Sequence, residues 1–284
     1  MKSFRKKLKN LWRPEMSLRE EVIEALVKAH IPSPRLEADI ILKHAAPDYP
    51  DISLKEQQNA LQMLKRRLNH EPMDKIIGYR EFYKSVFKVS RDVLSPRPDT
   101  EILVESALEL IAKDKAVKIL DLGTGSGCIL LSLLKENPKA LGTGVDISSK
   151  ALKIAKENAK ALNLESQTTF VNKSWTAPDF ITETYDLIVS NPPYIPSGEI
   201  ETLSEEVKDN DPLNALDGGA DGLNCYKEIA EIAPLLLTKD GHILLEVGYN
   251  QAEDVIKIFE NRGFKHIKTV QDLAQINRCV ILKK

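Results

Sequence analysis

The chain of 284 residues is long enough for about two domains, and 42% of its residues are hydrophobic, which suffices for a buried core. A formal net charge of −2 argues against a protein that coats nucleic acid, and three cysteines without paired spacing are typical of a reducing, cytoplasmic location. Basic residues gather in 1–16, but no apolar run follows them, so we expect neither a secretory signal nor a membrane span.

Residues 17–75 show the pattern of a small helical domain that follows the basic extension 1–16. Two capping boxes and one serine before a first-turn proline mark the helix starts (Ser17 with Glu20, Ser53 with Glu56, Ser33 with Pro34). Apolar residues then recur at helical spacing. No catalytic cluster is present here, so we interpret this domain as a bundle that recognises a partner.

Residues 76–94 change character, because aromatic and β-branched residues are concentrated there. This composition predicts a β-hairpin linker. The segment "SPRPDTE" (Ser95–Glu101) follows, and its two prolines predict an extended turn before a helix that starts near Thr100.

From residue 117 to the end of the domain 95–284, strands and helices alternate. This alternation predicts an α/β fold with a mostly parallel, seven-stranded Rossmann-like sheet covered on both faces. About six residues join the last two strands, too few for a parallel crossover, so we expect the last strand to be antiparallel. The expected strands are 117–121, 141–146, 167–172, 185–190, 241–247, 265–271 and 278–283, and the expected helices are 127–136, 149–162, 223–237 and 250–262.

A glycine loop, "DLGTGSG", joins the first of these strands to a helix. Gly123, Gly125 and Gly127 allow positive φ and close approach of the backbone to a ligand, and the helix start offers free N–H groups. Asp146, about twenty residues on, can accept hydrogen bonds from a ribose. The dinucleotide fingerprint needs a glycine where Cys128 stands, so the loop instead resembles the S-adenosylmethionine (SAM) loop of class I methyltransferases. A glycine turn without a ligand is the alternative.

Trp175, in "VNKSWTAP" after the third strand, is placed where an adenine ring would be covered. Its flat apolar face could stack on the base. An ordinary half-buried tryptophan is the alternative interpretation.

The tetrapeptide "NPPY" (Asn191–Tyr194) ends the fourth strand at the edge where ligands bind in such sheets. The two prolines have no N–H, so the backbone can only accept hydrogen bonds there. The side-chain oxygen of Asn191 and the carbonyl of Pro192 could hold an NH2 group, with Tyr194 as an apolar wall. A loop that is merely stiffened by Pro192 and Pro193 is the alternative.

Six stretches together resemble the PrmC/HemK family of protein glutamine methyltransferases. They are "GYREFY", "SPRPDTE", "DLGTGSG", "SNPPYIP", "DPLNALDGGADGL" and "LLEVGYNQ", and the resemblance extends from residue 17 to the end. It implies methylation of the side-chain amide nitrogen (N5) of the glutamine in the Gly-Gly-Gln motif of class 1 peptide chain release factors. The methyl donor would be SAM, leaving as S-adenosylhomocysteine, with no metal, and the helical domain would help to hold the release factor.

The same resemblance assigns the site residues. SAM would contact the glycine loop, the ribose carboxylate, the tryptophan and the asparagine (Asp121, Gly123, Thr124, Gly125, Ser126, Gly127, Asp146, Trp175 and Asn191). The substrate glutamine would be held by Asn191–Tyr194, with Asn191, Pro192 and Tyr194 as the catalytic set. Ser95–Arg97 would approach the methionine end of SAM. Ser95 and Gln275 depart from the family pattern, where we expect an apolar residue and often a glycine.

Two other function classes stay open from the residues alone. An enzyme that methylates exocyclic amines of DNA or RNA could use the same tetrapeptide on a flipped base. The insertion 198–222 opposes this, because it carries eight acidic residues against one lysine and would suit a basic protein partner. A binding module without activity is the third class, and the intact set of acceptors argues against it.

Overall fold

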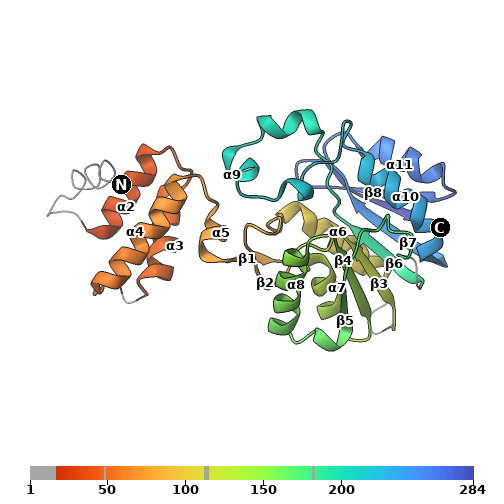
Figure 1. Ribbon diagram of the computed structural model, residues 1–284, viewed down its shortest axis with the longest axis horizontal. Helices are drawn as coiled ribbons and strands as arrows, with labels where there is room; N and C mark the ends of the chain where they lie inside the picture. Colours follow the sequence, from red (N-terminus) through yellow and green to blue (C-terminus); the bar gives the residue numbers. More distant parts are fainter. Residues whose placement is uncertain (1–16, 48, 112–114, 181–182) are drawn as a thin grey trace. The chain divides into compact units, whose positions relative to one another are not determined.

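The computed structural model describes residues 17–47, 49–111, 115–180 and 183–284, so the predicted extension 1–16 lies outside the described residues. The chain divides into two compact units, one up to Ile77 and the other from Gly78 to Lys284 (Figure 1). Within the described ranges, no helix is both long and apolar enough to cross a membrane.

The first unit consists of helices α2 (Leu18–Lys28), α3 (Pro34–Ala45), α4 (Leu54–Leu68) and α5 (Met73–Ile77). The capping boxes predicted at Ser17 and Ser53 are both formed. The cap predicted at Ser33 is wrong. Ser33 adopts a left-handed conformation with φ 51° and its side chain makes no capping hydrogen bond, so α3 starts on Pro34 with backbone bonds alone.

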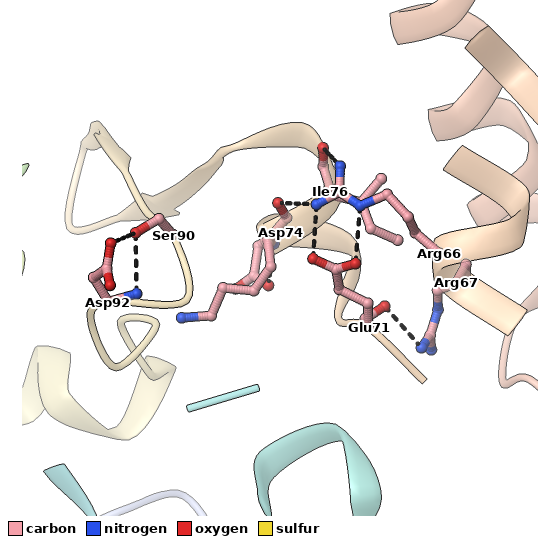
Figure 2. A network of polar contacts seen from close by, with 8 residues as sticks. Arg66, Arg67, Glu71, Asp74, Ile76, Ser90 and Asp92 are labelled. Carbon is pink, nitrogen blue, oxygen red and sulfur yellow. Dashed lines mark hydrogen bonds and ion pairs between the residues drawn. The ribbon is translucent and has the colours of Figure 1, made fainter. Parts of the chain in front are cut away.

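Two arginine–glutamate pairs, each with two hydrogen bonds, satisfy buried charges in this unit. Arg67 and Glu37 pair at 2.6 Å and join α4 to α3, with the arginine side chain 4% exposed. Arg66 binds both carboxylate oxygens of Glu71 and donates to the carbonyls of Lys75 and Ile76, which fixes the turn into α5 (Figure 2). Bidentate pairs of this kind satisfy charges that burial would otherwise make costly.

The second unit begins with the hairpin that the aromatic-rich segment predicts. Strands β1 (Tyr79–Phe82) and β2 (Ser85–Lys88) pair antiparallel. The rings of Phe82 and Phe87 are buried and meet edge to face, with centroids 6.0 Å apart. Lys88 exchanges backbone hydrogen bonds with the Asn158 side chain, so the hairpin is attached to the helix that carries Asn158.

A seven-stranded sheet forms the centre of the second unit. Its order is β5-β4-β3-β6-β7-β9-β8, with β3 (Lys118–Leu122), β4 (Leu141–Asp146), β5 (Thr168–Asn172), β6 (Tyr185–Ser190), β7 (Leu237–Glu246), β8 (Lys265–Gln271) and β9 (Asn277–Lys283). The pairs from β5 to β7 are parallel, and β9 is antiparallel to both neighbours. The predicted sheet with an antiparallel last strand is therefore confirmed.

Alternating strand residues enter two different cores. Ile188 and Ile243 pack on one face with α10 (Asn224–Leu236) and α11 (Ala252–Glu260), whereas Leu187, Val189 and Leu244 pack on the other with α6 (Glu101–Leu110) and α7 (Cys128–Glu136). Helix α8 (Ser149–Ala161) packs against β4 and β5. This three-layer arrangement leaves the carboxyl ends of the parallel strands as a ligand-binding edge (Figure 1).

Two local features differ from the sequence pattern. Strand β7 starts at Leu237 rather than 241, because the chain enters the sheet directly after α10 and Leu237 pairs with Tyr185. The insertion contains short helical turns, η3 (Ser197–Thr202), α9 (Glu205–Lys208) and η4 (Leu213–Ala215). Gln275, where we expect a glycine, has φ 62° in the turn before β9, which is the conformation that glycine adopts most readily.

Candidate active site

The glycine loop turns the chain sharply from β3 into α7. The N–H groups of Gly123 and Thr124 both donate to the Val145 carbonyl at 2.9 Å, which ties the loop to the neighbouring strand β4. All three glycines have positive φ, with Gly127 (81°) immediately before the helix. A Cβ on Gly127 would lie 3.0 Å from the Leu131 side chain, so both the conformation and the packing require glycine there.

Asp146 ends β4 and holds the loop from the other side. Its two carboxylate oxygens accept from Gly125 N at 2.9 Å and from Ser148 N at 2.8 Å. Each oxygen keeps a second lone pair, so the carboxylate can still accept from a ligand hydroxyl. Burial raises the pKa of Asp146, and the two backbone bonds oppose that shift.

Asp121 lies under the loop and is completely buried. One of its oxygens accepts from the Thr124 hydroxyl at 2.7 Å, and the other has no hydrogen-bond partner. Burial raises the pKa of Asp121 to about 7, with the Thr124 bond acting against it. A buried carboxyl with an unsatisfied oxygen is costly to a fold, and such costs are concentrated at functional sites.

A cavity opens beside this loop, at the carboxyl ends of the strands. Its lining comprises the loop, the segment after β2, residues after β4, Trp175 and part of NPPY (Asp92–Arg97, Thr100, Gly123–Ser126, Cys128, Ile129, Asp146–Ser148, Ala151, Trp175, Asn191, Pro193, Pro212, Asn214 and Ala215). Trp175 is fixed by its indole N–H, which donates to Glu228 at 2.9 Å. A Cβ on Gly123 would lie 3.6 Å from its ring, an ordinary van der Waals contact, so the indole lies directly beside the glycine loop.

The NPPY segment leaves β6 directly beside the cavity. The Asn191 Nδ2 donates to the Thr100 hydroxyl at 3.3 Å, and its Oδ1 is the amide end that remains for a ligand. The Tyr194 carbonyl accepts from Gln251 Nε2 at 2.9 Å, and the Gln251 Oε1 accepts from Gly248 N at 3.0 Å. Gln251 thus fixes the tetrapeptide to the loop after β7.

A second cavity adjoins the first and shares Asn191 with it. Charged and polar groups in its lining are Arg97, Asp99, Asn191, Tyr194, Glu246 and Arg278, and its remaining lining is largely apolar. Burial raises the pKa of Tyr194 to about 12, so its phenol stays neutral at physiological pH. A flat neutral ring and a set of polar groups suit an uncharged polar side chain.

Most of the predicted site residues gather at this edge. Gly123–Ser126, Asp146, Trp175, Asn191 and Pro193 line the first cavity, and Tyr194 lines the second. Asp121, Gly127 and Pro192 are buried and line neither cavity, and Gly127 directly precedes α7. Ser95 and Arg97 line the first cavity, and the Ser95 hydroxyl is buried without a partner, so this departure from an apolar residue is located at the site itself.

Four residues at this edge were not predicted from the sequence: Thr100, Glu246, Gln251 and Arg278. A signal for Glu246 was available in "LLEVG", because an acidic residue that ends an apolar strand is unusual in a buried position. Thr100 and Gln251 lie in quoted stretches, but ordinary helix-start and loop chemistry accounts equally well for such residues. Arg278 had no local signal, since its position depends on the antiparallel pairing of β9.

The first cavity has the features that SAM requires. It offers a carboxylate for the ribose at Asp146, a flat ring at Trp175 for the adenine, and the partnerless buried hydroxyls of Ser95 and Ser126 for polar groups. Within the described ranges, no group of three or more His, Cys, Asp or Glu side chains could hold a metal ion.

Comparison with known proteins places this chain in a family. A model described as the methyltransferase small domain matches residues 98–207. Release factor glutamine methyltransferases are 38% identical in Caulobacter vibrioides (91% of this chain, 92% of that protein) and 43% identical in Thermodesulfovibrio yellowstonii (83% and 84%). A methyltransferase structure from Pyrococcus furiosus, 15% identical with a TM-score of 0.52 over 70% of this chain and 88% of that one, shares the fold. The chain therefore belongs to the family of release factor glutamine methyltransferases.

Proposed function

We propose that this enzyme uses SAM to methylate the side-chain amide nitrogen of the glutamine in the Gly-Gly-Gln motif of class 1 release factors. The observation that carries the proposal is the orientation of Asn191. Its NH2 end is engaged by Thr100, which leaves an acceptor oxygen beside the SAM-type cavity. The relatives that carry the release-factor name match over most of their length, which supports the same substrate.

The main contribution of the protein to catalysis would be to place the substrate amide against the methyl group of SAM. Bound SAM would supply a methyl group activated on a sulfonium. The Asn191 Oδ1 and the Pro192 carbonyl would accept the two amide hydrogens of the glutamine, which directs the nitrogen lone pair at the methyl. As the N–C bond forms and the S–C bond breaks, the nitrogen loses one proton to water. Placement alone can contribute up to roughly 7–11 kcal/mol to lowering the barrier.

The residues predicted for SAM are arranged to hold its separate parts. Asp146 would accept from the ribose hydroxyls and Trp175 would cover the adenine, while the glycine loop allows close approach of the backbone. Arg97 lines both cavities and pairs with Asp211 at 2.8 Å, so the insertion is tied to the proposed methionine end.

The insertion 198–222 supports a basic protein partner in the cytoplasm over a nucleic acid. Its residues border both cavities, through Pro212 and Ala215 on one side and Leu203 and Val207 on the other. Five of its acidic side chains are exposed (Glu199, Glu201, Glu205, Asp209 and Asp221). Exposed carboxylates at the mouth would repel a phosphate backbone and attract basic residues that flank the substrate glutamine. We expect no stable binding of nucleic acid.

The test is transfer of label from methyl-labelled SAM to a purified class 1 release factor. We expect labelling of the natural factor and none of the variant in which the motif glutamine is replaced by alanine. Equal labelling of both would refute the glutamine assignment. Labelling of a DNA or RNA oligonucleotide instead would favour the exocyclic-amine alternative.

A further inference from the structure

Glu246 is a buried carboxyl that the proposed chemistry does not yet use. It ends β7, its side chain lines the second cavity, and the residue is 3% exposed. The Oε2 atom has no hydrogen-bond partner. The same cavity is lined by Asn191 and Tyr194 and by none of the glycine-loop residues that line the first cavity.

Glu246 is linked to Asn191 through a short polar chain. The Asn191 Nδ2 donates to the Thr100 hydroxyl at 3.3 Å. The Thr100 hydroxyl and the Asn191 side chain both lie close enough to the Glu246 carboxyl to lower its pKa. An ionised carboxylate can only accept, so it selects the NH2 end of the asparagine amide and turns the hydroxyl of Thr100 toward itself. Thr100 alone could not make this selection, because a hydroxyl both donates and accepts.

We propose that Glu246 is a positioning residue for methyl transfer, whose carboxylate holds Asn191 by its NH2 group so that Oδ1 accepts from the substrate amide. This inference rests on the proposed function. A reversed asparagine would present two donors to the substrate NH2 group, which would repel it instead of holding it. Glu246 therefore affects turnover by fixing which end of Asn191 faces the substrate.

The surroundings of Glu246 set the pH range in which this selection operates. The charges that act on the pKa of Glu246 are those of Arg278 on β9 and Asp99 before α6. The Glu246 charge in turn raises the pKa of the neutral groups that face it, Tyr194 after β6, Tyr226 on α10, Cys128 on α7 and Cys279 on β9. Burial raises the pKa of Glu246 to about 7, and the Thr100 hydroxyl, the charge of Arg278 and the Asn191 side chain oppose that shift. The carboxylate is therefore formed as pH rises through about 7, and it is lost below that pH.

The decisive variant is Glu246→Gln, which keeps the shape and removes the acceptor-only character. We expect its kcat on a release factor to fall about 10- to 100-fold at pH 8, the range for a hydrogen bond to a charged group. We expect the Kd for SAM, measured by calorimetry, to stay within about twofold of wild type. We also expect the wild-type rise of kcat between pH 6 and 8 to be smaller in the variant, with Asp121 titrating in both proteins.

Tyr226→Phe is the matched control. The Tyr226 hydroxyl donates to the backbone carbonyl of Glu246 at 2.8 Å, so this variant removes a buried hydrogen bond at the same residue and leaves the carboxyl in place. We expect a lower melting temperature and a wild-type pH profile. A wild-type kcat and pH profile in Glu246→Gln, or a loss equal to that of Tyr226→Phe, would overturn the proposal.

Two further measurements separate this proposal from the others. If Glu246→Gln does not fold, Glu246→Asp retains an acceptor one methylene further away, and a wild-type kcat there would overturn the proposal. Infrared titration of the wild type should show a carboxyl band that is lost near pH 7 and absent from a Glu246 variant, and no such difference would contradict it. A wild type that binds SAM but labels no release factor would refute the proposed function instead.

Discussion

Buried charged side chains are fully paired in the helical unit, whereas at the ligand-binding edge of the sheet they are only partly paired. In the helical unit, the buried arginine of the Arg67–Glu37 pair and the buried carboxyl of Glu71 both lie in bidentate pairs. At the sheet edge, Asp121 and Glu246 are buried, and each has a carboxylate oxygen without a hydrogen-bond partner. Within the described ranges, the buried side-chain polar atoms without a partner all belong to the second unit.

This difference distinguishes charged side chains that stabilise the fold from charged side chains that are available to bind a ligand. A fully paired group stabilises its neighbours, and removing one partner leaves an uncompensated charge. An unsatisfied group destabilises the free protein and is available to a substrate or cofactor. The two regions should therefore respond to mutation in opposite directions, one in stability and the other in activity.

The largest effect on stability is expected for Glu37→Ala. It removes the carboxylate that pairs with the buried Arg67 guanidinium, although the bond from Arg67 to the Glu71 carbonyl remains, and it should cost about 3–5 kcal/mol, measured by amide hydrogen exchange across α2–α4. Asp39→Ala on the same helix is the control, because its partner Arg19 is 39% exposed, and we expect a much smaller loss of stability than for Glu37→Ala. Similar losses in the two variants would remove the distinction between buried and exposed pairs.

Asn191→Ala should have the largest effect on activity. Removing an acceptor aimed at the reacting group should lower kcat by about 10²–10³-fold, as for a preorganised hydrogen-bonding group, while SAM affinity changes much less. Asn261→Ala, at an exposed position at the end of α11, serves as the control and should be silent. Loss of SAM binding with unchanged turnover at saturation would contradict the role given to Asn191.

Asp121→Asn tests the comparison further, because we expect it to raise the stability of the protein while it weakens SAM binding. The pKa of Asp121 is raised in the fold, so its contribution to stability is present below its unfolded pKa and is lost as pH rises through about 7. A neutral asparagine avoids this loss. We expect the variant to be more stable than the wild type by about 2 kcal/mol at pH 8. This figure starts from roughly 1.4 kcal/mol per unit of pKa shift and is reduced because the structure relaxes around the charge. At pH 4 the stability should change little.

The measurement for Asp121→Asn is thermal melting at both pH values together with calorimetric SAM binding, which should weaken. A melting temperature that falls equally at both pH values would show that the carboxylate supports the fold.

Gly248→Ala should give the smallest of these effects. A Cβ there would lie 2.9 Å from the Tyr194 ring and 2.7 Å from Gln251 Oε1, so the tyrosine wall must shift. We expect kcat/KM for the release factor to fall by a factor that corresponds to about 1–2 kcal/mol of lost transition-state stabilisation, within the range for overpacking. Gly198→Ala is the control, since nothing lies within 4 Å of its added Cβ. An unchanged kcat/KM in Gly248→Ala would show that the ring position is unimportant.

The sequence was sufficient for the fold because its signals are local. Strand–helix alternation predicts the parallel sheet, and the short connection before β9 predicts the antiparallel last strand. The boundary of β7 was missed because Leu237 follows a helix without a turn signal and joins the sheet only by pairing with Tyr185.

The site was accessible from the sequence where its residues form a contiguous motif or, like Asp146, follow one at a characteristic spacing. The glycine loop and NPPY are each a contiguous stretch, so the residues within each one could be placed together before the structure was known. Thr100 and Glu246 are separated by 145 intervening residues and meet Asn191 only through packing of α6, β6 and β7. Contacts of this kind have no sequence period, so they could not be predicted from spacing.

The most direct test of the central claim is the position of the methyl group after reaction. Wild-type enzyme, SAM, a class 1 release factor and a DNA duplex are incubated together, and the products are mapped by tandem mass spectrometry. We predict one added methyl on the side-chain amide nitrogen of the motif glutamine and an unmodified duplex, with the product absent when Asn191→Ala replaces the wild type. Methyl on a base, or on another residue of the release factor, would contradict the account.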